Sequence, residues 1–250
     1  MSKSFSRIMT LTKRNLKELF RDPISLCFTL GLPLLMELLF YFLFHDKTSQ
    51  FDMKYLAPGI VVFSQSFIAL FMGFIMSLDR SSSFLTRLYV SKAKSYEFIL
   101  GYALSFIPLI LIQSVLFFLV GGIIDNSIFG VGMVLAILAS LITALFFIVL
   151  GILFGVLCNE RSVGGIASIV ITGQSLLSGM WFPVDSVSGG MLAVMNALPF
   201  RNATILIQNL ILGINSPFND FVKPLLIVLA YTITTIVLAI VLFKKKMKEN

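Results

Sequence analysis

The stretch VGMVLAILASLITALFFIVLGILFGV, residues 131–156, contains no Asp, Glu, Lys or Arg. A helix rises about 1.5 Å per residue, so about 20 consecutive apolar residues cross the hydrocarbon core of a bilayer. Outward from this stretch, five more segments have similar length and apolar character: residues 25–44, 56–78, 98–120, 164–182 and 224–243. The sequence therefore predicts an all-α integral membrane protein with six transmembrane helices, forming a single domain over residues 1–250.

The composition supports a membrane environment for most of the chain. Hydrophobic residues make up 58% of the 250 residues and charged residues only 12%, whereas a soluble domain carries about 25% charged residues. The two cysteines, Cys27 and Cys158, are too few for a disulfide scaffold, and we expect both to be reduced thiols. No small-residue cleavage site follows residue 44, so we expect the first span to be retained.

The positive charges divide the connections between spans into two sets. One set carries 15 of the 19 Lys and Arg residues: residues 1–24, 79–97, 157–163 and the tail after residue 243. The other set carries the remaining four: residues 45–55, 121–130 and 183–223. Because positive residues concentrate in cytoplasmic loops, both termini are predicted to be cytoplasmic. The net charge of +7 then reflects membrane topology rather than nucleic-acid binding.

The connection at residues 183–223 is unusually apolar for a loop. It contains two short hydrophobic pieces, residues 191–198 and 203–214, which Pro199 separates. Runs of about 10–14 residues are too short to cross a bilayer and usually lie in the interface or re-enter the membrane. We therefore expect two short helices that dip into the outer leaflet, with Trp181 at the outer interface where aromatic belts form.

The residues before the first span carry apolar side chains at helical spacing. These are Phe5, Ile8, Met9, Leu16, Leu19 and Phe20. Basic residues occupy other positions, which is typical of an amphipathic helix lying in the cytoplasmic interface. Asp22-Pro23 is expected to end this helix and to turn the chain into the first span. The alternative interpretation is a solvated basic arm.

Motifs for nucleotide and metal binding are absent from the sequence. There is no G-x-x-x-x-G-K-[ST] phosphate loop, and the single histidine, His45, has no metal-ligand partner at a suitable spacing. We therefore expect this chain to bind no cofactor and no metal, and to have no enzymatic site of its own.

Glu37 is the one clear ionisable residue inside a predicted span. A charge at that depth is costly, so the side chain should face protein or water and have a partner. It could contact a substrate or a proton in a translocation path, or it could be a protonated carboxyl group that hydrogen-bonds to another helix. The membrane-embedded amides of Gln65, Gln113 and Gln174 are its candidate partners, and the four residues form the candidate substrate path.

The connection DRSSSFLTRLYVSKAKSYE, residues 79–97, is longer than the one between the fourth and fifth spans. Its spacing of Phe84, Leu85, Leu88 and Tyr89 suits a short amphipathic helix lying across the inner face of the membrane. A solvated turn is the alternative. The length of this connection indicates that it presents a surface to a partner.

Gly151 and Gly155 form a G-x-x-x-G pattern in the fourth predicted span. Small residues at this spacing let a neighbouring helix approach closely. Such pairs also arise by chance in apolar sequence, so the pattern predicts helix packing and says little about function.

Three stretches resemble the ABC-2 family, the membrane permeases of a class of ATP-binding-cassette exporters. KRNLKELFRDPISLCFTLGLPLL (13–35) is similar to the family's opening helix, Arg-Asp-Pro turn and first span. SSSFLTRLYVSKAKSYEFILG (81–101) is similar to the family's pattern between the second and third spans. LLSGMWFPVDSVSGGMLAVMNALPF (176–200) is similar to the Ser-Gly-x-x-Phe-Pro turn and later Leu-Pro of its outer hairpin.

The resemblance implies a dimer with a second copy or a paralogue, each permease docked on a separate ATPase subunit that holds ATP and Mg²⁺. The connection at 79–97 would be the coupling helix, seated in a cleft of the ATPase. Coupling would fall to Arg80, Phe84, Arg87, Leu88 and Tyr89. The substrate would pass between the two permeases, near the first, second and fifth spans. The outer-hairpin residues would be Trp181, Pro183, Pro199 and Arg201, the last standing where a small or hydroxyl residue is usual.

The leading hypothesis is the permease subunit of an ATP-driven exporter in the bacterial cytoplasmic membrane, acting in drug or antimicrobial-peptide resistance. The apolar spans favour an amphipathic substrate: a drug, a peptide antibiotic or a lipid-like molecule. Export of a polysaccharide or teichoic acid is the alternative within the family. An ion-coupled secondary transporter using Glu37 is the alternative from another class, and it should show broken helices or inverted repeats. A membrane-embedded enzyme is disfavoured by the lack of clustered polar residues.

Overall fold

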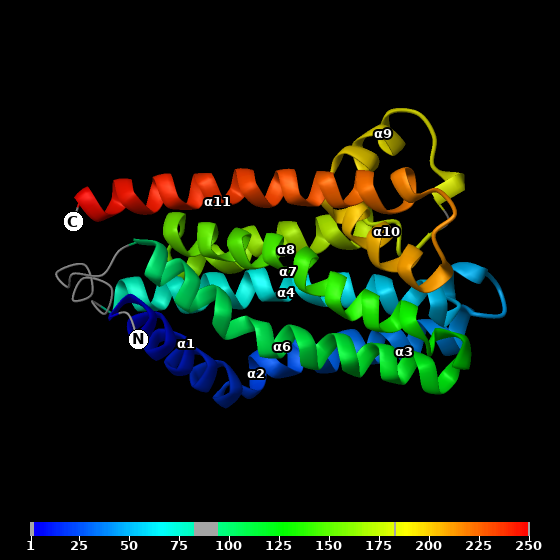
Figure 1. The fold of residues 1–250 in the computed structure, drawn as a ribbon, viewed down its shortest axis with the longest axis horizontal. Coiled ribbons are helices and arrows are strands. Elements are labelled where there is room, and N and C mark those ends of the chain that lie inside the picture. Colours follow the sequence, from blue (N-terminus) through cyan, green and yellow to red (C-terminus); the bar gives the residue numbers. More distant parts are fainter. Residues whose placement is uncertain (1–2, 83–94, 183, 250) are drawn as a thin grey trace.

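The computed structural model describes residues 3–82, 95–182 and 184–249, and their regular elements are all helices (Figure 1). The longest are α1 (Lys3–Arg21), α4 (Met53–Ser81), α6 (Ser95–Ile124), α7 (Val131–Leu157) and α11 (Lys223–Glu249). Shorter α-helices are α2 (Pro23–Leu26), α3 (Leu32–Phe44), α8 (Glu160–Leu177), α9 (Gly190–Ala197) and α10 (Pro199–Leu212). The expected all-α membrane fold is confirmed.

Five helical segments of the described residues are long and apolar enough to cross a membrane. They are Pro23–Phe44, Met53–Ser81, Tyr96–Ile124, Val131–Leu157 and Pro217–Phe243. These segments contain the first four predicted spans and the last one. Their multi-pass arrangement is therefore that of an integral membrane protein.

The fifth predicted span, residues 164–182, corresponds to α8, which begins and ends earlier than expected. Glu160 and Arg161 lie in its first turn and lower its hydropathy, and its 18 residues extend about 27 Å. It ends before Gly179, whose φ of +74° is a left-handed conformation that terminates helices. α8 is thus shorter and less apolar than the five long segments and is not among them, but it runs along α4 from one end of the bundle to the other (Figure 1). With this additional pass, both termini lie at the same end of the bundle.

The apolar connection after α8 forms two short helices, as predicted. α9 and α10 meet at an angle of 72°, and Pro199 occupies the first turn of α10. Their 8 and 14 residues extend about 12 and 21 Å, so neither crosses a bilayer alone. Proline breaks the pair because it lacks an N–H group and restricts the residue before it, here Leu198, to extended backbone.

The N-terminal helix α1 is also confirmed, and the turn after it is built as the sequence indicates. Asp22 caps α2: its side chain accepts hydrogen bonds from the backbone N–H of Ile24 at 3.1 Å and from the hydroxyl of Ser25. Pro23 then occupies the first helical position. A π-helical turn, Cys27–Gly31, joins α2 to α3 directly before Pro33, where the proline ring disturbs regular α-helical bonding.

α4 is the central helix of the bundle. Of its most apolar 18-residue stretch, 83% is buried, and it packs against α3, α6, α7, α8 and α10. Figure 1 shows both termini, the beginning of α6 and the end of α7 at one end of the bundle. We call this the basic end, because the chain segments that meet there carry most of the Lys and Arg residues. The α3–α4 and α6–α7 connections, with α9 and α10, lie at the opposite end.

Candidate functional site

A charged junction joins three helices at the basic end. Asp79, in the last turn of α4, is only 2% exposed. Both of its carboxylate oxygens accept hydrogen bonds from the guanidinium of Arg14 on α1, and the hydroxyl of Tyr102 on α6 also donates to it. The hydrogen bond to Asp79 raises the pKa of Arg14, which therefore stays charged. The junction fixes α1 and α6 to the end of α4.

A second contact holds α1 along α6. Glu97, in the first turn of α6, accepts a hydrogen bond from Ser4 and lies 3.4 Å from Arg7 Nε. Further along, Gly101 allows α1 to approach closely, because a Cβ atom there would stand 2.8 Å from Leu11 Cβ. The N-terminal helix is thus attached to the bundle by charge at one point and by tight packing at the next.

Arg80 and Ser81 join the end of α4 to α7 and α8. The Arg80 guanidinium donates to the backbone carbonyls of Val156 and Cys158, where α7 ends. These carbonyls lack partners within the helix, so a cation there is favourable. Ser81 donates a hydrogen bond to Glu160 at the start of α8. Arg80 is the one predicted coupling residue that the structure describes; Phe84, Arg87, Leu88 and Tyr89 lie outside the described residues.

α4 and α7 cross in close contact through glycine, as the G-x-x-x-G pattern predicts. A Cβ atom at Gly151 would stand 2.6 Å from the carbonyl oxygen of Ala69, and one at Gly155 only 2.3 Å from Met76 Cβ. Such distances exclude any larger residue without movement of a helix. The charged contacts at the end of α4 are therefore followed along the same helix by tight packing against α7.

The candidate substrate-path residues are not hydrogen-bonded to one another among the described residues. Gln65 is fully buried and joins α4 to α7: its Nε2 donates to the Ser140 carbonyl at 3.0 Å, and Thr143 donates to its Oε1 at 2.9 Å. Glu37, Gln113 and Gln174 are also fully buried, but their polar atoms have no hydrogen-bond partner among the described residues. The expected bond from Glu37 to one of these amides is thus not formed.

Glu37 instead faces the part of α6 near its end at the opposite end of the bundle. A Cβ atom at Gly121 would stand 3.4 Å from Glu37 Oε1 and 3.1 Å from Ala57 Cβ. The carboxyl group is therefore enclosed between α3, α4 and α6, at a point where α6 has no side chain.

Of the outer-hairpin residues, Trp181 lies in an aromatic cluster at the opposite end. The ring of Trp181 lies 4.3 Å from that of Phe40 and 6.0 Å from that of Phe63, and its Nε1 donates to Ser175 Oγ at 2.6 Å. Arg201 reaches the turn after α8, where its Nη1 would lie 3.2 Å from a Cβ atom at Gly179. Pro199 starts α10, and Pro183 lies outside the described residues.

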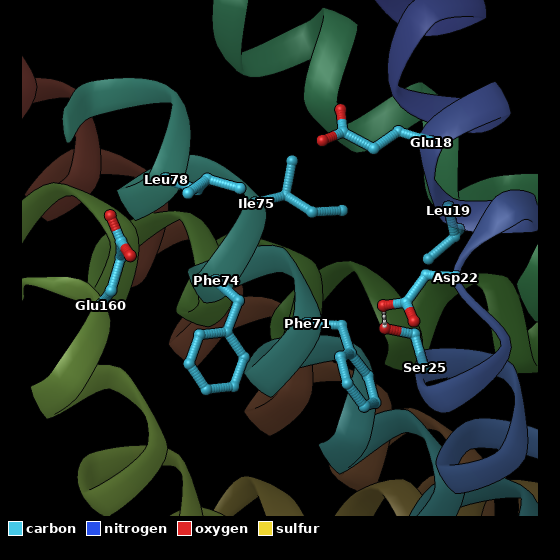
Figure 2. Close-up of a pocket in the computed structure, with 9 residues that line it drawn as sticks. All are labelled: Glu18, Leu19, Asp22, Ser25, Phe71, Phe74, Ile75, Leu78 and Glu160. Atoms are coloured by element: carbon cyan, nitrogen blue, oxygen red, sulfur yellow. Dashed lines mark hydrogen bonds between the residues drawn. The ribbon is translucent and has the colours of Figure 1, made fainter. Parts of the chain in front are cut away.

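A cavity of about 380 Å³ lies beside α4 at the basic end (Figure 2). One wall is an apolar stripe of α4: Phe71, Phe74, Ile75 and Leu78. The flank on the α1 and α2 side is formed by Glu18, Leu19, Asp22 and Ser25, and Glu160 of α8 lies on the other flank. The cavity therefore combines an apolar wall with three carboxylates.

Asp79, Tyr102, Glu18 and Glu160 were not predicted as site residues from the sequence. A weak signal existed for Glu18, which lies four residues before Asp22, the residue already predicted to end the N-terminal helix. Asp79 and Tyr102 carry a weaker signal, since only the fold shows that α1 supplies their partner. Among the described residues, no group of three His, Cys, Asp or Glu side chains could hold a metal ion.

Comparison with known families completes the assignment. The chain matches the family model described as ABC-2 type transporter over residues 6–212. No curated protein matches it. The matched range contains most of α1, the charged junction, the cavity, α9 and α10, and it covers well over half of the 250 residues. This chain belongs to the ABC-2 type transporter family.

Proposed function

We propose that this chain is the permease subunit of an ATP-driven exporter in the bacterial cytoplasmic membrane, with both termini in the cytoplasm. It works as a dimer, and each permease docks on a separate ATPase subunit that binds ATP and Mg²⁺. The family assignment supports the transport role. The concentration of positive charge at the basic end supports the orientation.

The contacts on either side of residues 83–94 carry this proposal. Arg80 and Ser81 join α4 to α7 and α8 just before that segment, and Glu97 joins α6 to α1 just after it. Asp79 connects α4 to both α1 and α6. A push on the segment by the ATPase would therefore act on five helices at once.

The central position of α4 explains how such a push would reach the substrate path. α4 and α7 are in close contact at Gly151 and Gly155, so the two helices cannot separate without losing packing contacts between them. The α4–α7 pair is then displaced as a rigid unit, and rigid-body displacement is a common form of switching in proteins. Nucleotide would shift the equilibrium by its different affinity for the two arrangements of the dimer.

The direct test is purification of the tagged full-length chain from its native cell in detergent, with identification of the proteins that co-purify. We expect an ATPase subunit in equal amount to the permease. Replacing both Arg87→Glu and Leu88→Glu should abolish co-purification. Arg161→Glu, a charge reversal at an exposed residue of the same end, is the matched control and should leave it intact. If the unmodified chain purifies without an ATPase, the proposal is wrong.

A second candidate, ion-coupled transport, is favoured by one observation. Glu37 is fully buried in α3 and both of its oxygens lack a partner among the described residues. Carboxyl groups inside the membrane commonly belong to proton relays. This candidate predicts transport that a protonophore abolishes and that Glu37→Gln also abolishes. The exporter predicts transport that needs ATP and survives both treatments.

The substrate within the exporter proposal is an amphipathic molecule. The apolar stripe of α4 in Figure 2 and the aromatic cluster around Trp181 support this class, because both offer apolar contact surface. A polysaccharide would need many polar partners, which these two surfaces do not offer.

A further inference from the structure

The cavity beside α4 has the size and lining of a binding site for a small molecule. Its volume of about 380 Å³ falls within the range of ligand pockets, roughly 300–1,000 Å³. Figure 2 shows the aromatic rings of Phe71 and Phe74 on α4 between Glu160 on one side and Glu18 and Asp22 on the other. An apolar body of modest size could therefore pack on the rings.

The charged groups of the lining are all acidic. Glu18 and Asp22 stand on one flank and Glu160 on the other, and no Lys, Arg or His lines the cavity among the described residues. Attraction between a cation and these carboxylates is strengthened next to α4, since apolar side chains lower the local dielectric constant. The cavity therefore selects for positive charge.

The nearby basic residues do not cancel this selection. Arg14, Lys17 and Arg21 line a separate, shallower depression that shares Glu18 and Asp22 with the cavity. The Arg14 guanidinium binds both oxygens of Asp79 and also forms an ion pair with Glu18 at 3.2 Å, so the charge of Glu18 is partly compensated. Asp22 accepts hydrogen bonds from the Ile24 N–H and the Ser25 hydroxyl, which are neutral donors. Glu160 accepts from Ser81, a neutral donor, so its negative charge stays uncompensated by that contact.

The apolar wall continues as an aromatic stripe toward the opposite end. Phe63, Phe67 and Phe71 are spaced four residues apart on α4, which places them on one face of the helix. The rings of Phe63 and Phe67 lie 5.4 Å apart, and that of Phe63 lies 6.0 Å from Trp181. Aromatic faces attract cations as well as apolar groups. The carboxylates thus lie at one end of a largely buried row of aromatic side chains on α4.

We propose that this cavity is the entry site for an amphiphilic organic cation, a molecule with an apolar body and one positive charge, taken up at the basic end. The inference rests on the proposed exporter function and names its substrate class. Glu18 and Glu160 bind the charge, and Phe71 and Phe74 bind the apolar body. Ser81, which lies two positions before residues 83–94, donates a hydrogen bond to Glu160. A displacement of residues 83–94 would therefore move Glu160 and change the lining of the cavity.

The test uses two probes of the same shape and opposite charge, tetraphenylphosphonium and tetraphenylborate. Equilibrium binding of each labelled probe is measured on the purified full-length chain in detergent. We expect the cation to bind with saturation and the anion to bind without it. Glu18→Gln and Glu160→Gln should each weaken cation binding about threefold to fivefold, as for partly exposed ion pairs. Asp46→Asn, a carboxylate at the opposite end, is the matched control and should change nothing.

Two further variants keep the test decisive if Glu160→Gln folds poorly. Phe74→Ala should weaken binding of the cation without changing the preference for positive charge. Glu18→Lys should reduce the ratio of cation to anion binding. Equal binding of both probes, or cation binding that all four lining variants leave unchanged, would overturn the proposal. Co-purification of an ATPase is scored on the same preparations, so failure of the cation site is distinguished from failure of the exporter function.

Discussion

The two ends of the bundle are held together by different kinds of interaction. At the basic end, α1, α4, α6, α7 and α8 are joined by charged groups: Arg14 with Asp79, Arg80 with the α7 carbonyls, and Glu97 with Ser4 and Arg7. At the opposite end, the contacts around Trp181 are mainly aromatic rings, with one side-chain hydrogen bond to Ser175.

This difference has a mechanical meaning. Charge-assisted hydrogen bonds fix the distance and direction between two groups, so a motion at one helix is passed to its neighbour. Contacts between aromatic rings tolerate sliding better, because dispersion and hydrophobic contacts are non-directional. The basic end is therefore suited to receive a push and the opposite end to open in response.

The largest expected effect comes from breaking the charged junction. Asp79→Asn leaves the Arg14 cation without its buried partner and should destabilise the protein by about 3 kcal/mol. This corresponds to a fall in melting temperature of roughly 6–12 °C for a chain of this size. Melting followed by circular dichroism in detergent measures it.

The double variant Arg14→Gln with Asp79→Asn supplies the control for this prediction. Removing both charges should cost less than the two single changes added together, because no unpaired charge remains. Additive losses would mean that the two side chains do not interact.

A substitution at the glycines where α4 crosses α7 should lower the melting temperature by the next largest amount. Gly155→Ala places a methyl group 2.3 Å from Met76 Cβ, so α4 and α7 must move apart, at a cost of about 1–3 kcal/mol. Gly165→Ala on α8 is the matched control, since no atom lies within 4 Å of the position that its methyl group would take. Equal melting temperatures for the two variants would contradict a close α4–α7 contact.

The opposite end should tolerate change better. Trp181→Phe keeps an aromatic ring but removes the hydrogen bond from Nε1 to Ser175, which is worth about 1 kcal/mol. The expected fall in melting temperature is about 2–4 °C. A loss as large as that of Asp79→Asn would remove the distinction between the two ends.

Glu37→Gln should have the smallest effect on stability, within about 0.5 kcal/mol. The carboxyl group makes no hydrogen bond to the described residues, so an amide of the same shape loses no partner. A large destabilisation, measured by the same melting experiment, would reveal a partner of Glu37 and reopen its role in ion-coupled transport.

Most of the fold could be predicted from the sequence, because spans, prolines and turns act locally. Runs of apolar residues located five spans, Asp22-Pro23 located the first turn, and Pro199 located the break between α9 and α10. The end of α8 was predicted too late, since hydropathy does not register the left-handed backbone of Gly179.

The candidate site could be predicted only in part, because its residues meet through the tertiary fold. Arg14 and Asp79 are 65 positions apart, and the sequence around either residue does not indicate that the other is its partner. Glu18 and Glu160 face one cavity only after α1 has packed along α6 and α8 along α4. Gln65 was chosen correctly as a buried polar residue, but its role in joining α4 to α7 depends on Ser140 and Thr143.

The most direct test of this account asks whether nucleotide at the basic end moves the opposite end. Trp181 is the only tryptophan of the chain. Its fluorescence in the complex with the ATPase is therefore obtained by subtracting the emission of the Trp181→Phe complex from that of the unmodified complex. We predict that ATP and Mg²⁺ change this signal, and that Asp79→Asn abolishes the change while the complex still assembles. A signal that nucleotide does not alter, or that Asp79→Asn leaves fully responsive, would contradict transmission through the charged junction.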